Sequence, residues 1–420
     1  MDKKLALGLL ILLFLSGSVL AQDLPDDELQ VNISGYFDSF DVNVMYPSIA
    51  ITRKVSDKTS ITGRYLVDMI TAASMKTGGS SSSGSGEREH EDDDEGREHD
   101  FGKTSSATSV NSVDAVTAAS SRGGGGVFGG EGLSSFDDVR NEFNLGVSQI
   151  VGENLISLNG IYSTERDYTS STLAGTISRQ FAMKNTTLQL GFVRSWDKVF
   201  PVIKDWTRSK DVVTYSANFS QLLGKSALIQ FLTSYSENNG YLADAYNQVS
   251  VDSMGTMVLR DPIHPNNRIR KAAATQLKFR LSEQSSMQMG YRYYWDNWDV
   301  VSHTFSMNYM RHMSDHVVLG LGWRTYLQNR AFFFKPQYAQ PEALMTSDIK
   351  LDKGYSNQLQ FELTLNGGRG QDYLPFLTSE KIQYNISLNV YSRHTQSGYW
   401  YNGQKNMIAT NFNLGIRYRF

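Results

Sequence analysis

The sequence predicts an all-β protein, a transmembrane antiparallel up-and-down β-barrel of about sixteen strands with long extracellular loops. Three observations carry this prediction. Segments of strand length alternate between apolar and polar residues along most of the chain. Short and long connections follow one another in turn between these segments. The final segment has one largely apolar face, and the chain stops on an aromatic residue.

The final segment runs from Ile408 to Phe420. Successive side chains of a strand point to opposite faces of the sheet, so this segment has two distinct faces. One face carries Ile408, Thr410, Phe412, Leu414, Ile416, Tyr418 and Phe420, and the other carries Ala409, Asn411, Asn413, Gly415, Arg417 and Arg419. Such a strand resembles the closing strand of bacterial outer-membrane barrels. That resemblance implies that Phe420 is a signal for the barrel-assembly machinery.

The amino-terminus is typical of a secretory signal peptide over residues 1–21. A short charged start precedes the apolar run from Leu5 to Leu15, and small residues lead to V-L-A at residues 19–21. The alternative is a membrane anchor, but the run is short against about 30 Å of hydrocarbon. We therefore expect cleavage after Ala21, export, and a mature barrel over residues 22–420.

The composition agrees with an exported barrel. No other stretch approaches the ~20 apolar residues of a transmembrane helix. The chain has no cysteine, so its stability cannot come from disulfides, whereas a closed barrel is stabilised by backbone pairing between strands. The formal net charge of −3 disfavours nucleic-acid binding.

The first three strands are expected at residues 30–39, 42–55 and 59–69, where apolar and polar residues alternate. The alternation then stops. Residues 75–135 are Gly/Ser-rich and acidic, and such a segment buries too little apolar surface to offset its chain entropy. We expect this insert to be a largely disordered extracellular loop.

Alternation resumes near Phe136 and continues to the end of the chain. Further strands are expected around residues 142–148, 156–162, 172–183, 185–196, 215–223, 227–235, 276–281, 288–295, 317–326, 359–364 and 384–390. Short connections fall at residues 56–58, 152–154, 184–185, 224–225, 282–286 and 313–315, and longer ones near 71–135, 165–171, 197–211, 238–267, 329–352 and 394–405. Residues 366–379 depart from this scheme, because they should form a short periplasmic turn but are long.

The competing fold is a large soluble all-β protein. Every strand would then need a partner sheet to cover outward aromatic residues such as Trp323. The alternation of short and long connections would also have no cause in a sandwich. We therefore favour the membrane barrel.

Several phrases of the sequence resemble the domain-of-unknown-function 3570 family of bacterial outer-membrane β-barrel proteins. They are V-D-A-V-T-A-A-S (113–120), S-T-E-R-D-Y-T-S (163–170), N-T-T-L (185–188), N-N-R-I-R-K-A (266–272), Y-R-Y-Y-W-D-N-W (291–298), S-H-T (302–304), R-T-Y-L-Q-N-R-A-F-F-F (324–334) and T-S-D-I-K-L-D (346–352). The resemblance spans nearly all of the mature chain and implies an outer-membrane barrel without an established activity. It also implies a neighbourhood of redox or metal biology, with a small lipoprotein or a redox protein as a partner.

The densest charged segment is residues 87–100, which hold nine carboxylates, two arginines and two histidines. Carboxylate and imidazole suit divalent cations, so weak and unselective metal binding is one hypothesis. Its candidate ligands are His90, Asp92, Asp93, Asp94 and His99. The alternative is a solvated, self-repelling surface loop.

A second set of charged residues is expected to face the lumen. It comprises Arg140, Glu142, Lys278, Arg280, Arg292, Arg324, Glu362, Arg417 and Arg419. A cationic ladder in a pore would favour anions. The alternative is that Arg–Glu pairs fill and brace a narrow lumen.

Catalysis finds little support in the sequence. Ser302 and His303 are adjacent in a strand and therefore point to opposite faces. No phosphate loop, dinucleotide fingerprint or zinc motif is present. We expect no enzyme activity and no cofactor beyond weakly bound metal.

We interpret the chain as an integral barrel of a Gram-negative outer membrane, porin-like, that transports small solutes, anionic or metal-bearing. Its expected partners are outer-membrane lipid and the barrel-assembly machinery, not nucleic acid. The alternative function is a structural barrel whose loops dock a surface or periplasmic redox or metal-related protein.

Overall fold

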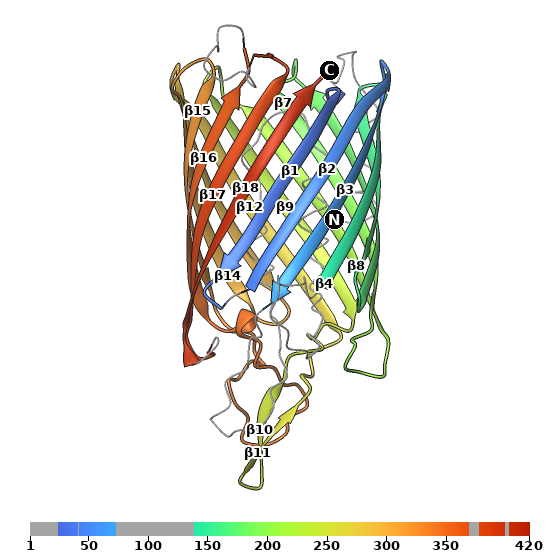
Figure 1. Cartoon of the computed structure of the whole chain (residues 1–420), viewed down its shortest axis with the longest axis vertical. Helices are drawn as coiled ribbons and strands as arrows, with labels where there is room; N and C mark the ends of the chain where they lie inside the picture. Colours follow the sequence, from blue (N-terminus) through green and yellow to red (C-terminus); the bar gives the residue numbers. More distant parts are fainter. Residues whose placement is uncertain (1–23, 41, 73–137, 369–377, 400–402) are drawn as a thin grey trace, which may run out of the picture.

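The computed structural model describes residues 24–40, 42–72, 138–368, 378–399 and 403–420, which form one closed β-barrel (Figure 1). Sixteen strands make the barrel, and every neighbouring pair is antiparallel, including β1 with β18, which closes it. The expected fold class is therefore confirmed. The signal peptide (1–21) and the insert (75–135) lie outside the described residues.

The barrel strands follow one another in chain order around the wall, except that β9 pairs directly with β12. They are β1 (Glu28–Asp38), β2 (Val42–Ser56), β3 (Thr59–Ala72), β4 (Asp138–Val151), β5 (Asn154–Thr164), β6 (Tyr168–Phe181), β7 (Thr186–Val199), β8 (Arg208–Leu222), β9 (Ala227–Gly240), β12 (Asn267–Ser282), β13 (Ser285–Asp296), β14 (Val301–His312), β15 (Val317–Gln328), β16 (Gly354–Asn366), β17 (Ile382–Thr395) and β18 (Asn406–Arg419). The two remaining strands, β10 (Val249–Ser253) and β11 (Thr256–Arg260), form a separate hairpin.

The two ends of the barrel differ in their connections. At the turn end, where the carboxy-terminus lies, most connections are short, and the long segment 367–381 is the exception that the sequence indicated. At the loop end, the connections 241–266 and 329–353 are long and project beyond the wall (Figure 1). One expectation was wrong: β6 begins at Tyr168, so the β5–β6 connection has only three residues.

The missed start of β6 has a simple cause. Residues 169–171 are Thr-Ser-Ser, which show no apolar alternation. They pair nevertheless with β5, and the Ser170 hydroxyl donates to Asp197 Oδ1 at 2.7 Å on the lumen side. Hydrogen bonding to the neighbouring strands, not apolar patterning, places these residues in the sheet.

The wall has an apolar outer face and a polar inner face. On β4, Leu145 is 67% exposed on the outside, whereas its neighbour Asn144 is 6% exposed on the inside. The same alternation holds on β14, where Ser302 is buried on the inside and His303 lies outside, with its ring nitrogen 2.9 Å from the Tyr291 hydroxyl. This pattern is typical of strands between lipid and an aqueous lumen.

Among the described residues, no helix reaches the length and apolarity that a membrane span requires. The named helical element there is the single turn η2 (Ile349–Leu351), in the β15–β16 connection.

The two long connections at the loop end pack on each other and form a cap, residues 241–266 and 329–353. Backbone hydrogen bonds join Tyr338 to strand β10 and Ile263 to Met345. Val249, Val251, Tyr338 and Met345 make a small apolar core between them. The sequence predicted loops here but not this ordered contact, because the pairing joins segments about ninety residues apart.

Candidate lumen site

Two turns at the loop end repeat one sequence motif. Residues 36–42 read Y-F-D-S-F-D-V and residues 294–300 read Y-W-D-N-W-D-V. In both, the tyrosine hydroxyl donates to the carboxylate of the aspartate two residues later, Asp38 at 3.1 Å and Asp296 at 2.7 Å. The same carboxylates accept the backbone N–H groups two and four residues further on. This repeat was visible in the sequence but was not identified there.

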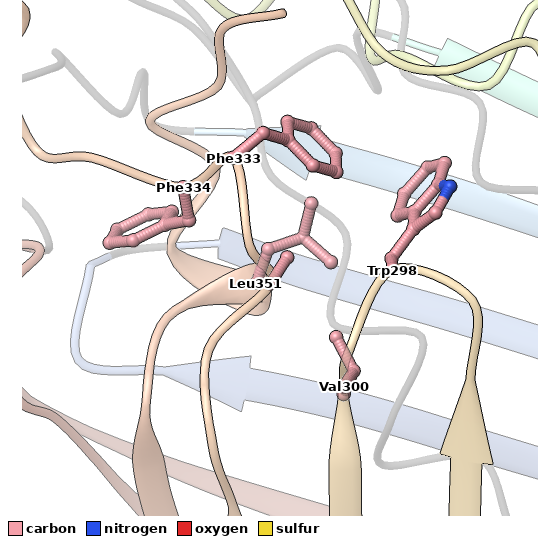
Figure 2. Close-up of a cluster of buried hydrophobic side chains, with 6 residues drawn as sticks. Trp298, Val300, Phe333, Phe334 and Leu351 are labelled. Atoms are coloured by element: carbon pink, nitrogen blue, oxygen red, sulfur yellow. The ribbon is translucent and has the colours of Figure 1, made fainter.

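The buried aromatic residues of these turns hold η2 at the barrel mouth. Phe40 packs with Ile349, and Trp298 packs in one cluster with Leu351 and Phe333. Figure 2 shows Trp298 and Val300, from the β13–β14 turn, facing Leu351 and the two phenylalanines of the β15–β16 connection. Because inward residues of β17 and β18 also pack on Ile349, η2 lies inside the mouth.

Hydrogen bonds from the wall fix the same segment. The Gln328 amide donates to the carbonyl oxygens of Lys350 at 2.7 Å and Asp352 at 2.8 Å. Asp352 is fully buried, and its Oδ2 accepts the N–H groups of Ser397 and Gly398. The β15–β16 and β17–β18 connections are therefore tied together, and we expect the cap to be stable.

His264 sits between the two halves of the cap. Its ring meets Trp298 and Phe333 edge-on, each at 5.3 Å between centroids, and its Nδ1 lies 3.0 Å from the Leu242 carbonyl oxygen. Burial lowers the pKa of His264 from 6.5 to about 4, against the opposing effect of Asp348. The folded cap therefore favours the neutral imidazole.

This depressed pKa predicts an acid-sensitive cap. The stability that the neutral His264 ring contributes to the folded cap is fully present above the unfolded-state pKa of 6.5. It is lost as the pH falls through the folded-state pKa of about 4. Limited proteolysis within residues 241–266 should therefore be faster at about pH 4.5 than at about pH 7.5. His264→Phe should remove much of this pH dependence, whereas His316→Phe at the turn end should not. An equal pH response in the wild type and the His264→Phe variant would contradict the assignment.

A cavity of about 140 Å³ lies along the inner face of strands β12 to β16. Three cations and one carboxylate line it: Lys278, Arg292, Arg324 and Glu362. All four were predicted from the sequence to face the lumen, and the structure brings them into one cavity, here named the β12–β16 groove. Its lining carries an excess of positive charge.

Glycines form part of the floor of the β12–β16 groove. A Cβ atom at Gly290 would stand 2.6 Å from Ser306 Oγ, and one at Gly322 would stand 2.5 Å from Asn308 Oδ1. Because glycine has no side chain, the polar side chains of the neighbouring strand can lie over these two positions. The groove is therefore a hollow lined by polar side chains.

The opposite wall carries a different charge arrangement. Seven strands separate β14 from β4 in either direction around the barrel, so β3 and β4 face the β12–β16 groove. There Arg140 pairs with Asp68 at 2.6 Å and with Glu165 at 3.8 Å, and Glu142 is buried. Arg140 is therefore charge-compensated on this wall, and Glu142 is buried on the same strand.

The remaining lumen candidates lie near the turn end. Arg280 and Arg419 are exposed there, and Arg417 is half-buried, with its Nε 3.4 Å from Glu28 Oε2. The Arg53 guanidinium lies over the Phe420 ring, with its Cζ atom 4.7 Å from the ring centroid. None of these residues lines the β12–β16 groove.

The candidate metal ligands His90, Asp92, Asp93, Asp94 and His99 lie outside the described residues. Within the residues that the structure describes, no group of three or more His, Asp or Glu side chains is arranged to hold a metal ion.

A closed, sixteen-strand antiparallel barrel with an apolar outer face and a charged lumen defines the class of the outer-membrane β-barrel proteins. Within this class, the model of the family described as "Protein of unknown function (DUF3570)" matches residues 14–214 and 203–409. The chain belongs to this family. The suspected resemblance is thereby confirmed.

No curated protein matches the sequence. Among solved structures, the siderophore receptor PirA from Pseudomonas aeruginosa is similar at 8% identity and a TM-score of 0.44; the match covers 93% of this chain but 62% of the receptor. OpdK from the same organism, solved with vanillate, is similar at 8% identity and a TM-score of 0.42, covering 94% of this chain and 98% of that one. CdiB from Acinetobacter baumannii is similar at 8% identity and a TM-score of 0.46, and the match covers 94% of this chain and 61% of CdiB. Similarities at this level carry no information on solutes.

Proposed function

We propose that the protein is an outer-membrane channel for small anionic solutes. The observation that carries this proposal is the excess of cations in the β12–β16 groove, where Lys278, Arg292 and Arg324 are accompanied by Glu362 alone among acidic lining residues. A barrel of about sixteen strands is wide enough for an aqueous channel. Cations along a constricted wall favour the passage of anions.

The proposed channel has a defined orientation. Barrels of this class place short turns and both termini in the periplasm and long loops outside the cell. The cap and η2 would then narrow the extracellular mouth, and the β12–β16 groove would lie below them. The signal peptide would direct export and be cleaved after Ala21.

No enzyme activity is part of this proposal. Ser302 points into the lumen and His303 points outward to Tyr291, so the pair cannot act as nucleophile and base.

The test is conductance in a planar bilayer with a salt gradient across it. We expect discrete channel currents and a reversal potential of the sign that marks anion preference. A silent, correctly folded protein, or a reversal potential that marks cation preference, would reject the proposal.

One observation favours a second candidate function, the docking of a partner protein. The β10–β11 hairpin projects from the cap (Figure 1), and Met254, Met257 and Leu259 are exposed on it. An exposed apolar edge strand can add a strand from another chain. Replacement of Met257 and Leu259 by aspartate should then abolish capture of a cell-surface partner without changing the currents.

A further inference from the structure

We infer that the β12–β16 groove binds an anionic saccharide, a sugar that carries a carboxylate. This inference rests on the proposed channel function, because it names the class of solute. Three features of the groove region point to it: an amide-rich lining, a tyrosine ring held along the wall, and two arginines near that ring.

Amides outnumber cations in the β12–β16 groove. Five side-chain amides line it, from Gln276, Gln288, Asn308, Gln358 and Gln360. An amide both donates and accepts hydrogen bonds, as the hydroxyls of a sugar do. A simple inorganic anion only accepts, so it would leave the acceptor oxygens of these amides unmatched. The lining therefore fits a ligand with many hydroxyls better than a bare anion.

One amide contact in the groove is weak enough to yield to a ligand. The Gln288 amide donates to Gln276 Oε1 at 3.4 Å, which is long for such a bond. A shorter bond at 2.6 Å holds Gln360 on Glu362 Oε1, which keeps the groove's carboxylate in place.

Two inward tyrosines lie beside the groove toward the loop end. The Tyr294 hydroxyl donates to Asp296, and the Tyr326 hydroxyl donates to Gln328 Oε1 at 2.5 Å. Each acceptor stands two residues further along the same strand, so each ring is held along the wall. The face of an aromatic ring is electron-rich and attracts the C–H groups on the flat side of a sugar. The Tyr294 ring packs against the buried cluster around Trp298, so the Tyr326 ring is the one that provides a stacking surface.

The arginines stand near this surface. Arg292 and Tyr326 both pair with Thr304, one on each side of β14, and Arg324 pairs with Ser306 in the next inward row. A sugar stacked on Tyr326 would therefore have Arg324 two residues away on the same strand and Arg292 across β14 on strand β13. Guanidinium groups bind carboxylates through two parallel hydrogen bonds. A sugar acid uses the stacking surface, the amides and the cations together.

The experiment measures binding of three probes, glucuronate, glucose and benzoate, to the purified full-length protein by titration calorimetry, and block of the channel current by each. We expect glucuronate to bind about tenfold or more tightly than glucose, which lacks the charge, and benzoate, which lacks the hydroxyls. Arg324→Gln and Tyr326→Ala should each weaken glucuronate binding about tenfold. The matched control is Arg64→Gln, an inward arginine on β3, which should leave glucuronate binding unchanged.

The outcomes separate the inference from the channel function. Anion-selective currents with equal binding of glucuronate and benzoate, or equal binding of glucuronate and glucose, would overturn the saccharide inference and leave the channel intact. Selective glucuronate binding by a protein that conducts no current would support the ligand class and reject the channel. Equal weakening by Arg64→Gln and Arg324→Gln would also overturn the placement of the site.

Discussion

Replacement of both Arg292 and Arg324 by glutamate is expected to convert the channel from anion to cation preference. The lining of the β12–β16 groove would change from three cations and one carboxylate to one cation and three carboxylates. In a narrow passage with walls of low dielectric constant, charges of one sign exclude ions of the same sign. The reversal potential in a salt gradient should therefore change sign.

The control for this variant makes the same charge change elsewhere. Arg280 and Arg419 are exposed at the turn end, outside the groove, so replacing both by glutamate should shift the reversal potential only slightly. If the two double variants behave alike, net charge rather than the groove determines selectivity. The heat-modifiable migration of a folded barrel on gels should be the same in all variants.

Asp296→Ala is expected to release the cap. The Asp296 carboxylate accepts the N–H groups of Trp298 and Val300, the Tyr294 hydroxyl, and the Arg268 guanidinium at 2.6 Å. Removal of one member of a buried ion pair costs about 3–5 kcal/mol, because the other charge is left unpaired. The β13–β14 turn should then loosen and withdraw Trp298 from the cap. Limited proteolysis at residues 329–353 should become at least about tenfold faster.

Two further variants check this account of the cap. Asp296→Asn keeps an acceptor for the backbone N–H groups but loses the charge, so its effect should be smaller. Asp57→Ala, in an exposed turn at the opposite end, should leave cleavage at 329–353 unchanged. Wild-type cleavage rates in the Asp296→Ala variant would show that the cap does not depend on this turn.

The barrel could be predicted from the sequence because apolar and polar residues alternate along each strand. The outward and inward faces of β4 and β18 match the apolar and polar sets read from residues 142–148 and 408–420. The number of strands followed from the alternation of short and long connections. What could not be predicted was the start of β6, since Thr169, Ser170 and Ser171 have no apolar pattern to place them.

The candidate site was predictable only in part. The alternation of side chains along each strand identified the inward-facing residues Lys278, Arg292, Arg324 and Glu362. Alternation cannot say which inward residues of different strands share one cavity. That depends on the stagger between strands, which places Arg292 opposite Thr304 and Arg324 opposite Ser306. The cap was missed for a related reason, because its core joins Val251 to Tyr338 across a long separation in sequence. The twin turns around Asp38 and Asp296 were within reach, since the seven-residue motif repeats in the sequence.

The central claim is that one face of each strand meets lipid and the other lines an aqueous lumen. Because the chain has no cysteine, single cysteines can report this directly. Ser306→Cys and Met307→Cys change neighbouring residues of β14, one inward and one outward, and each variant is treated in outer-membrane vesicles with a charged, water-soluble thiol reagent. The structure predicts rapid labelling at position 306 and labelling at position 307 only after detergent is added. Equal labelling of both positions, or faster labelling at 307 in the intact membrane, would contradict it.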